Sequence, residues 1–592
     1  MLGIITSLKG LPSTLLQLLV AASSVAAAPP QWPPAGQSVL QDSTEFSSKG
    51  AVACESKICS QIGIDLLAQG GNAVDAWIGT QLCVGVTAMY HSGLGGGGFA
   101  LIRDRSGSYT VIDYREAAPA AAFQDMYQGN VGGSVFGGLS VAVPGELRGL
   151  ELAHKKFGVL PWKTVVEPAA FVARDGFPVT EDTVRYMEGG IDEAGKNFLL
   201  SDPSWAQDFA PNGSLLTLGE TMYRKRYAET LLQIAEHGAD VFYTGPIADA
   251  TIATIRQHNG TMTHGDLSSY KAIVREAISI SYRGYKLFSS SAPSSGAVCL
   301  GALKTMEGYD AADSAKVNLT LHRFDEAMRF AYGAHQALGD PAFVAGVGAL
   351  EARMLDASAA AAVRSRILDN ATQPVENYGP GGVYTAEGHG TSHVAAADAS
   401  GAAVSSTTTV NLLFGSLLLV PGTGVVLNDE MNDFSIPGHQ NEFGYAPSPA
   451  NFVRPGKRPL SSITPVIVER PGDGDAGGVS LFYAAVGAAG GSRIISSTTQ
   501  VLWRLLEREM SMRDAVAEPR FHDQLMPDHT VFEWMFDNST VTSMSEKGHN
   551  VTWARDGISA VQGVRVVGEL GRGGSFEAVG ETRQKNSGGL TL

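Results

Sequence analysis

Apolar residues near the start of the chain recur at helical spacing. A stripe of isoleucine and leucine, four residues apart, runs through residues 55–69 and ends at Gly70-Gly71. Asn72 and Asp75, three residues apart, have the pattern of a helix N-cap, and apolar residues then continue to about Ala88. The pattern therefore predicts two consecutive helices joined by a short glycine-containing turn.

The next segment changes from helical to strand periodicity. Residues 99–103 and 109–113 flank Ser106-Gly107, which predicts two strands joined by a turn. The preceding glycine run, residues 93–98, formally satisfies the GxGxxG dinucleotide-binding pattern. A phosphate site needs that pattern after a strand and before a helix, whereas here it follows a helix. We therefore predict close backbone packing beside a sheet, and no dinucleotide site.

Helical and strand patterns then alternate in blocks through the rest of the chain. The predicted blocks are helices within 145–275, strands in 277–290, helices in 297–338 and 347–368, strands in 394–434 and 463–487, and a helix at 494–510. Periodicity alone thus predicts a protein of mixed α and β structure.

The composition narrows the possible functions. A net charge of −16 and the absence of Lys/Arg runs argue against nucleic-acid binding. A hydrophobic content of 44% and a charged content of 17% are ordinary for a folded enzyme. With 592 residues the chain can bury one or more large cores, and length alone suggests several domains.

The first 28 residues differ in composition from the rest. Lys9 and the amino terminus supply a weak positive charge, a short apolar run follows, and small residues end at Ala28 before Pro29-Pro30. This is the pattern of a secretory signal, residues 1–28, that is cleaved. An uncleaved signal anchor is the alternative, but the apolar run is short and interrupted by polar residues. We expect a secreted, vacuolar or cell-surface protein, bound to a membrane only if this segment is retained.

Glycosylation and disulfide formation are both compatible with secretion. The six Asn-x-Ser/Thr sequons are Asn212, Asn259, Asn318, Asn370, Asn538 and Asn550. The four cysteines are Cys54, Cys59, Cys83 and Cys299. Four cysteines in so long a chain are no disulfide scaffold. No CxxC or HExxH motif indicates a metal site, and we predict no metal and no cofactor.

The junction Gly390-Thr391 is the strongest candidate for chemistry. A threonine in mid-chain is a poor nucleophile, but cleavage of this bond would give Thr391 a free α-amine. That amine has a pKa of roughly 8 and can act as the base for the hydroxyl of the same residue. The Gly/Pro-rich residues 371–383 predict an exposed loop upstream. Residues 394–401 and 402–414 predict strand, turn and strand, so that Thr391 would open a strand at the edge of a sheet.

Motifs around Thr391 occur together with a second set early in the chain. The first set lies at residues 390–393, 407–415, 421–435, 457–462 and 490–493, and the second at residues 70–76, 91–99, 113–119 and 143–149. In this order they resemble the motifs of the γ-glutamyltransferases (γ-glutamyl transpeptidases), a family of N-terminal-nucleophile hydrolases. The resemblance extends from about residue 47 to about residue 580.

The resemblance implies a fold and a subunit organisation. The expected fold is α+β, a four-layer αββα sandwich built as one globular body from two cleavage products. Self-cleavage before Thr391 would leave a large subunit, residues 29–390, and a small catalytic subunit, residues 391–592, associated as a heterodimer. Cys59 and Cys83 resemble a pair that is bridged in animal members of the family. The expected free, buried cysteines are Cys54 and Cys299.

The resemblance also implies roles around the nucleophile. Thr409 would orient the Thr391 hydroxyl, although without the resemblance it would be a routine strand residue. The oxyanion hole would come from the backbone N–H groups of Gly490 and Gly491, where glycines leave the N–H groups unobstructed and a helix end adds positive potential.

A further set of residues would hold the glutamyl head group. Arg115 would grip the α-carboxylate through two parallel hydrogen bonds. Further donors to that carboxylate would be Ser461 and Ser462. The residues around the ammonium group would be Asn411, Glu430 and Asp433. From the sequence alone, the last two acids are equally compatible with solvated loop charges, and Arg115 with Glu116 is compatible with a surface pair.

The implied activity is hydrolysis of glutathione and transfer of its γ-glutamyl group. Thr391 would form a γ-glutamyl ester, which water or an amino acid or dipeptide acceptor resolves. The closest alternative is an N-terminal-nucleophile acylase of the cephalosporin or glutaryl type. A secreted glycoprotein that is never processed is the alternative from another class, and the absence of G-x-S-x-G disfavours a serine hydrolase.

Residues 436–445 resemble a lid that covers the pocket in some relatives, where a tyrosine helps to close it. Phe443 is the best match to that tyrosine, and Tyr445 follows two residues later. Since Phe443 lacks a hydroxyl, we expect a lid that is less firmly closed.

Overall fold

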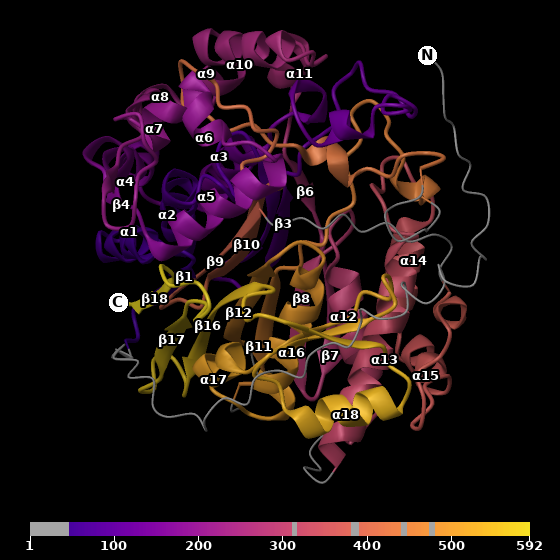
Figure 1. Ribbon diagram of the computed structural model, residues 1–592. Coiled ribbons are helices and arrows are strands. Elements are labelled where there is room, and N and C mark those ends of the chain that lie inside the picture. The colour runs from indigo at the N-terminus through magenta and orange to yellow at the C-terminus, as the bar shows by residue number, and fades with distance from the viewer. Residues whose placement is uncertain (1–46, 311–315, 380–389, 440–446, 473–479) are drawn as a thin grey trace, which may run out of the picture. The chain divides into compact units, whose positions relative to one another are not determined.

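The computed structural model describes residues 47–310, 316–379, 390–439, 447–472 and 480–592. The predicted signal segment, residues 1–28, lies outside the described residues. Two large sheets form the centre of the described part, and each contains strands from both sides of the Gly390–Thr391 bond (Figure 1). The segments before and after this bond therefore share one fold.

The first sheet has seven antiparallel strands, and the strand that contains Thr391 lies in its interior. In spatial order the strands are β18 (Gly588–Thr591), β1 (Gly50–Cys54), β9 (Gly390–Asp398), β10 (Ala403–Asn411), β2 (Gly97–Arg103), β3 (Tyr109–Asp113) and β6 (Ile273–Arg275). The predicted hairpins β2–β3 and β9–β10 are confirmed.

The prediction of an edge strand at Thr391 is wrong. β9 pairs with β10 from Gly390 onward and with β1 over Ala395–Asp398, so it is an interior strand of the sheet. Only the beginning of the strand, at Gly390 and Thr391, lies at an open end of the sheet.

The second sheet has six antiparallel strands and faces the first. In spatial order its strands are β17 (Ser575–Val579), β16 (Ala560–Val567), β12 (Leu481–Ala489), β11 (Val466–Arg470), β8 (Tyr285–Ser290) and β7 (Ala277–Tyr282). β12 packs against β9 and β10, and small buried side chains such as Ala395 and Ala485 fill the interface. Small residues allow the two sheets to approach closely there.

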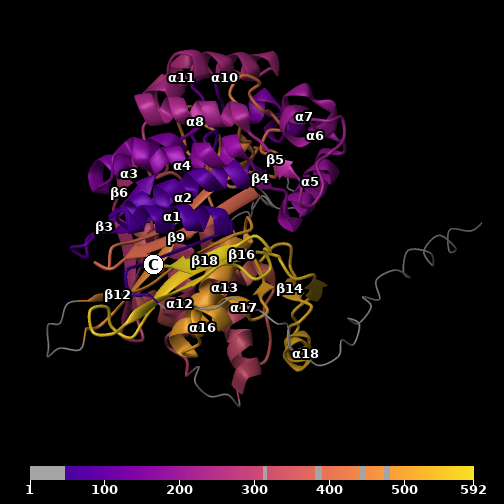
Figure 2. The same cartoon turned by 90° about the vertical axis from the view of Figure 1, so that its left-hand side faces the viewer.

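Helices cover the outer face of each sheet (Figure 2). α1 (Lys57–Ala68) and α2 (Ala73–Thr87) pack on the first sheet, and α4 (Trp162–Asp175) packs on α2. α12 (Gly296–Met306) and α16 (Arg493–Glu507) pack on the second sheet, and α13 (Val317–His335) packs on α12. The predicted four-layer αββα sandwich is confirmed.

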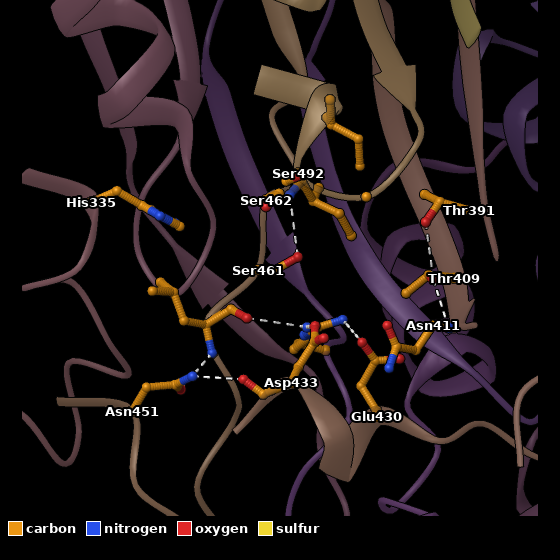
Figure 3. Close-up of a pocket in the computed structure, with 15 residues that line it drawn as sticks. His335, Thr391, Thr409, Asn411, Glu430, Asp433, Asn451, Ser461, Ser462 and Ser492 are labelled. Atoms are coloured by element: carbon orange, nitrogen blue, oxygen red, sulfur yellow. Dashed lines mark hydrogen bonds and ion pairs between the residues drawn. The ribbon is translucent and has the colours of Figure 1, made fainter. Parts of the chain in front are cut away.

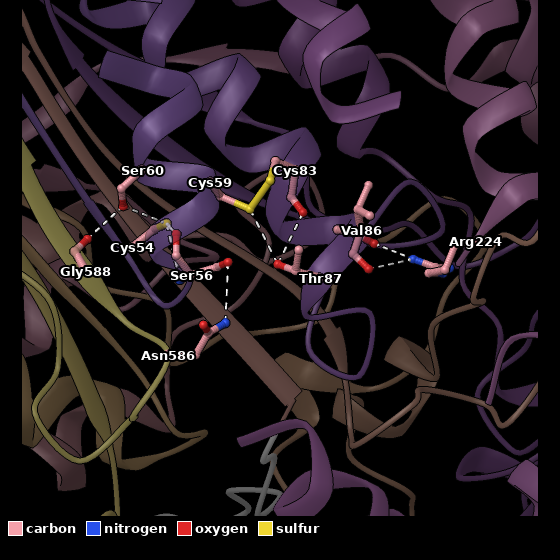
Figure 4. The surroundings of a disulfide bond; sticks show 11 residues. Cys54, Ser56, Cys59, Ser60, Cys83, Val86, Thr87, Arg224, Asn586 and Gly588 are labelled. Atoms are coloured by element: carbon pink, nitrogen blue, oxygen red, sulfur yellow. Dashed lines mark hydrogen bonds between the residues drawn. A yellow bond between two sulfur atoms is a disulfide. The ribbon is translucent and has the colours of Figure 1, made fainter. Parts of the chain in front are cut away.

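The first two helices follow the sequence prediction closely. The Asn72 side chain accepts hydrogen bonds from the N–H groups of Val74 and Asp75, and Asp75 bonds back to the Asn72 N–H, which completes a capping box. The disulfide between Cys59 and Cys83 joins α1 to α2 (Figure 4). Cys54 and Cys299 are free and buried, as expected.

The remaining elements surround this core. The other helices are α3 (Glu146–Phe157), α5 (Glu181–Ala194), α6 (Phe198–Ser201), α7 (Pro203–Phe209), α8 (Lys225–His237), α9 (Asp240–Tyr243), α10 (Pro246–Gln257), α11 (His264–Ser269), α14 (Val347–Met354), α15 (Ala357–Arg364), α17 (Met512–Ala517) and α18 (Asn538–Glu546). The short strands are β4 (Phe177–Pro178), β5 (Thr221–Met222), β13 (Phe521–His522), β14 (Thr530–Glu533) and β15 (Val551–Ala554). Within the described part of the chain, no helix is both long and apolar enough to cross a bilayer.

Two predicted blocks differ from the structure. The strand block 394–434 ends at Asn411, because the apolar residues that follow pack into an aromatic cluster instead of continuing the sheet. Phe414, for example, has a φ of 62° and contacts the rings of Phe198 and Trp205. The predicted helix 347–368 is two helices, since the Asp356 side chain accepts from two N–H groups and caps a new one.

His393 is buried between the two sheets, two residues after Thr391, and gives the fold a dependence on pH. Its Nδ1 lies 2.8 Å from Thr407 Oγ1, and burial lowers its pKa to about 3. The unfolded chain binds a proton at this residue below about pH 6.5, whereas the folded protein does not, so the free energy of unfolding falls as the pH falls.

Between pH 7 and pH 5 the free energy of unfolding should fall by about 2 kcal/mol less in His393→Gln than in the unchanged protein, because glutamine does not titrate. Urea unfolding of both proteins at the two pH values measures this difference. An equal loss in both would contradict the assignment.

Candidate active site

The nucleophile candidate is positioned by two paired strands. Thr391 on β9 lies opposite Thr409 on β10, and their Oγ1 atoms are 3.2 Å apart. The Thr409 hydroxyl donates to the Gly390 carbonyl at 2.6 Å, and Asn411 N–H donates to the Thr409 oxygen at 2.8 Å. Since Thr409 has one proton and gives it to that carbonyl, it must accept the proton of the Thr391 hydroxyl.

This arrangement suits attack on the preceding peptide bond. The Thr409 hydrogen bond polarises the carbonyl of Gly390, the group that Thr391 would attack. Thr391 is 5% exposed, so solvent competes little for its hydroxyl. The site thus holds nucleophile and electrophile in adjacent residues. Figure 3 shows Thr391 beside Thr409 in the cavity.

Gly490 and Gly491 lie where β12 ends and α16 begins, as predicted. Their φ angles are 124° and 60°, which favour glycine. The Gly490 carbonyl accepts from Arg493 N–H at 3.2 Å, so the Gly491 N–H, on the opposite side of that trans peptide, points away from the helix. Gly491 lines the same cavity as Thr391.

A buried arginine forms the centre of the adjoining pocket. Arg115 is 1% exposed, and its guanidinium donates to the carboxylates of Glu430 and Asp433. It also reaches the Leu460 carbonyl at 3.3 Å. Burial opposes its charge, but Glu430, Asp433 and Glu116 outweigh burial and raise the pKa of Arg115 above its usual value.

The carboxyl groups outnumber this single cation. Burial raises the pKa of Glu430 well above its usual value, although Arg115 partly opposes the shift. Burial also raises the pKa of Glu116, to about 8. The cavity is lined by one guanidinium and by two carboxyl groups, those of Glu430 and Asp433, while Glu116 contacts Arg115 without lining the cavity. Such a lining offers oxygen acceptors to an ammonium group and a guanidinium to a carboxylate, as a zwitterion requires.

Two residues that the sequence analysis missed also line this pocket. Asn451 donates to the Asp433 carbonyl at 2.6 Å and accepts from the Leu460 N–H at 3.0 Å. His335, at the end of α13, lies with its Nε2 2.8 Å from Ser295 Oγ, and burial lowers its pKa to about 4. Neither residue lies in a recognisable motif, so only the fold places them in the site.

The structure brings the predicted site residues together around Thr391. One cavity is lined by Arg115, Thr391, Thr409, Asn411, Glu430, Asp433, Ser461, Ser462 and Gly491. Gly490 lines a second cavity, which also contains Thr391. Phe443 and Tyr445 of the expected lid lie outside the described residues.

A buried cluster of histidines and acids lies elsewhere. His322 Nε2 donates to the Leu368 carbonyl at 2.7 Å, so its Nδ1 accepts from His549 Nε2, also at 2.7 Å. His549 Nδ1 lies 3.0 Å from an Asp325 oxygen, which leaves His549 with two N–H donors. Burial lowers the pKa of His549, but Asp325 outweighs burial and raises it. These contacts make the cluster an ion-pair network between α13 and the segment after α18, and none of its residues lines a cavity at Thr391.

Comparisons with known proteins give the same family as the sequence motifs. A family model described as gamma-glutamyltranspeptidase matches residues 59–590. The chain is 48% identical to the glutathione hydrolase proenzyme of Arthroderma benhamiae, over 92% of this chain and 93% of that protein. It is 44% identical to the glutathione hydrolase of Aspergillus flavus, over 93% of this chain and 90% of that protein.

Two solved structures resemble the fold. The cephalosporin acylase from Bacillus halodurans has a TM-score of 0.81 and 25% identity, over 96% of this chain and 99% of that one. The gamma-glutamyltranspeptidase of Helicobacter pylori has a TM-score of 0.52 and 28% identity, over 59% of this chain and 97% of that one.

Proposed function

The chain belongs to the gamma-glutamyltranspeptidase family, and from this premise we propose that it is a self-processing glutathione hydrolase and γ-glutamyl transferase with Thr391 as its nucleophile. The observation that carries the proposal is one cavity in which the Thr391 hydroxyl adjoins a buried arginine and an excess of carboxyl groups.

The first stage is self-cleavage. Thr391 Oγ1 attacks the Gly390 carbonyl carbon, the bond to the Thr391 nitrogen breaks, and the resulting ester is hydrolysed by water. The products are the proposed large subunit, residues 29–390, and small subunit, residues 391–592. The Thr409 hydrogen bond to the Gly390 carbonyl supports this step, because it stabilises negative charge that develops on that oxygen.

The second stage is turnover. The new α-amine of Thr391 takes the proton of its own hydroxyl, and Oγ1 attacks the γ-carbonyl of glutathione. Cysteinylglycine leaves, and the γ-glutamyl ester passes to water or to an amino acid or dipeptide. Arg115, Ser461 and Ser462 would hold the α-carboxylate of the substrate. Asn411, Glu430 and Asp433 would hold its ammonium group.

The oxyanion of each tetrahedral intermediate of turnover would lie at Gly490 and Gly491. The direction of the Gly491 N–H, away from α16, supports this assignment. Loss of one such donor typically lowers the rate by about a hundred- to a thousandfold.

Substrate choice separates this function from that of an acylase. We expect turnover of a γ-glutamyl anilide and little turnover of a glutaryl-cephalosporin, because a glutaryl group has no ammonium for Glu430 and Asp433. Initial rates on the two substrates measure this. Faster turnover of the glutaryl compound would make the acylase the better assignment.

The proposed route is the secretory pathway, which allows a prediction about glycans. Five sequon asparagines are exposed, namely Asn212, Asn259, Asn370, Asn538 and Asn550. Asn318 is half-buried, and its side-chain oxygen accepts from the Thr540 hydroxyl at 2.9 Å. We expect glycopeptides at exposed sequons and none at Asn318. Asn259→Gln should therefore remove one glycan, whereas Asn318→Gln should leave the glycan mass unchanged, as mass spectrometry can measure.

A further inference from the structure

A second cavity adjoins Thr391, and apart from Thr391 it shares no lining residue with the head-group pocket. Its volume is about 220 Å³, far more than a single water molecule needs. Its walls come from α5, from residues 557–560 and from residues 583–584, and Gly490 lines it beside the nucleophile. Since the first pocket takes the γ-glutamyl head group, this cavity lies where the leaving group departs and an incoming nucleophile arrives.

One polar atom in this cavity has no partner. His91 is 2% exposed, and its Nδ1 lies 2.8 Å from a carboxylate oxygen of Glu55. Its Nε2 has no hydrogen-bond partner among the described residues, and His91 lines the cavity. A buried polar nitrogen without a partner is costly, so its presence beside a reactive centre calls for a ligand.

Glu55 fixes the protonation pattern of this histidine. It accepts hydrogen bonds from His91, from the Ser392 hydroxyl and from Gln584 Nε2, the last at 3.3 Å. An acceptor-only carboxylate requires the proton of the neutral imidazole to lie on Nδ1. The lone pair therefore lies on Nε2, the unpartnered nitrogen of a residue that lines the cavity, which is the arrangement of a general base with an orienting carboxylate.

We propose that His91, held by Glu55, is the base that deprotonates the acceptor amine of γ-glutamyl transfer, and that the second cavity binds this acceptor. The inference rests on the proposed function and concerns its transfer step. The Thr391 hydroxyl is excluded as the partner of His91, because it bonds to Thr409.

The step balances as follows. The acceptor enters as an ammonium ion, and His91 Nε2 takes one of its protons. The free amine attacks the ester carbonyl carbon on Thr391, which forms the new C–N bond. The bond from that carbon to Thr391 Oγ1 then breaks, and a second proton from the amine restores the Thr391 hydroxyl. His91 releases its proton to solvent before the next turnover.

The mouth of the cavity carries a cation for the acceptor carboxylate. Arg185 is 45% exposed, contacts Asp182 at 3.0 Å and donates to the Tyr186 hydroxyl at 2.8 Å. The guanidinium of Arg185 has five N–H donors, so it can also bind a further anion. Arg583, also in the wall, is less suited, because it already pairs with Glu533 and Glu581. An amino acid or dipeptide can thus place its amine at His91 and its carboxylate at Arg185.

Other groups set the charge around His91. The acids near it are Glu55 and Asp182, and the cations in the same cavity are Arg185 and Arg583. The ring centroids of Tyr90 and Tyr186 lie 4.6 Å and 4.3 Å from the centroid of the imidazole. All remain in a variant that changes His91 alone.

The test compares two acceptors in His91→Asn. The asparagine amide can still donate to Glu55 in place of Nδ1, but it has no nitrogen base. Glycylglycine is largely an ammonium near pH 7, since α-amino groups have a pKa of about 8. Hydroxylamine is already neutral at that pH and needs no base before it attacks. We expect transfer to glycylglycine to fall about 10-fold more than transfer to hydroxylamine, because about a tenth of the glycylglycine amine is neutral at pH 7 without a base. The gap should close as the pH rises above the pKa of the glycylglycine amine.

Controls separate this role from a structural one. His264→Asn removes an exposed histidine that also lies 2.8 Å from an aspartate, and should change neither transfer rate. Arg185→Gln should raise the KM for glycylglycine but not the KM for glycylglycinamide, in which an amide replaces the carboxylate. Equal losses with both acceptors in His91→Asn, or no loss with either, would overturn the assignment of His91. Absence of γ-glutamyl turnover by the unchanged enzyme would overturn the proposed function itself, which is a separate result.

Discussion

Thr391→Ala is expected to yield one uncut chain without activity. Alanine has no oxygen to attack the Gly390 carbonyl, so the bond stays intact and no N-terminal amine forms. Turnover should fall by at least about 10⁴-fold, as for loss of other covalent nucleophiles. A denaturing gel and N-terminal sequencing of the mature protein measure cleavage, and γ-glutamyl anilide hydrolysis measures activity.

Thr391→Ser is the matched control, since it keeps the oxygen and loses only a methyl group. Both cleavage and turnover should persist in it, at lower rates. Two chains from the alanine variant would refute self-cleavage by Thr391. Active wild-type enzyme that is a single unbroken chain would also rule out an N-terminal base.

Arg115→Gln is expected to lower kcat/KM for γ-glutamyl substrates by about 10²- to 10³-fold. Glutamine cannot form the forked pair with a carboxylate, and it leaves Glu430 and Asp433 without their buried cation. Removing one partner of a buried ion pair typically costs about 3–5 kcal/mol, which also makes folding of this variant a concern. Arg115→Lys keeps the charge but cannot form two parallel hydrogen bonds. Its kcat/KM should therefore lie between the values of the unchanged enzyme and of Arg115→Gln.

A substrate pair distinguishes carboxylate binding from general damage. A 4-aminobutyryl anilide has the ammonium and the scissile amide but no α-carboxylate. Arg115→Gln should reduce its turnover much less than that of the γ-glutamyl anilide, and self-cleavage into two chains should show that the fold is retained. Parallel losses on the two substrates would mean that Arg115 acts only through Glu430 and Asp433.

The head-group pocket has one feature that the motifs alone do not contain. Arg115 is already bonded to both acids in the structure, although all three residues were expected to contact the substrate separately. A bound substrate would therefore exchange contacts within a preformed network. Such preorganisation keeps the charges in place before binding, which lowers the cost of ordering them.

Local signals were sufficient for several elements. The sequence alone determined the helix pair before and after Gly70-Gly71, its cap at Asn72, and the hairpin around Ser106-Gly107, because periodicity, capping and turns act within a few residues. It failed at residues 412–434, where an apolar run packs into a core without strand pairing. Apolar character predicts burial, but it does not distinguish a strand from a packed loop.

The sequence by itself also determined the family and indicated Gly390-Thr391 as the candidate cleavage junction, since contiguous motifs carry both. Only the tertiary structure decided that β9 is an interior strand, that Arg115 meets acids more than 300 residues away, and that His91, bonded to Glu55, lines a cavity beside Thr391. Contacts of this kind depend on strand order and on how the layers pack. Residues so far apart leave no periodic trace in the sequence, so the folded chain alone brings them together.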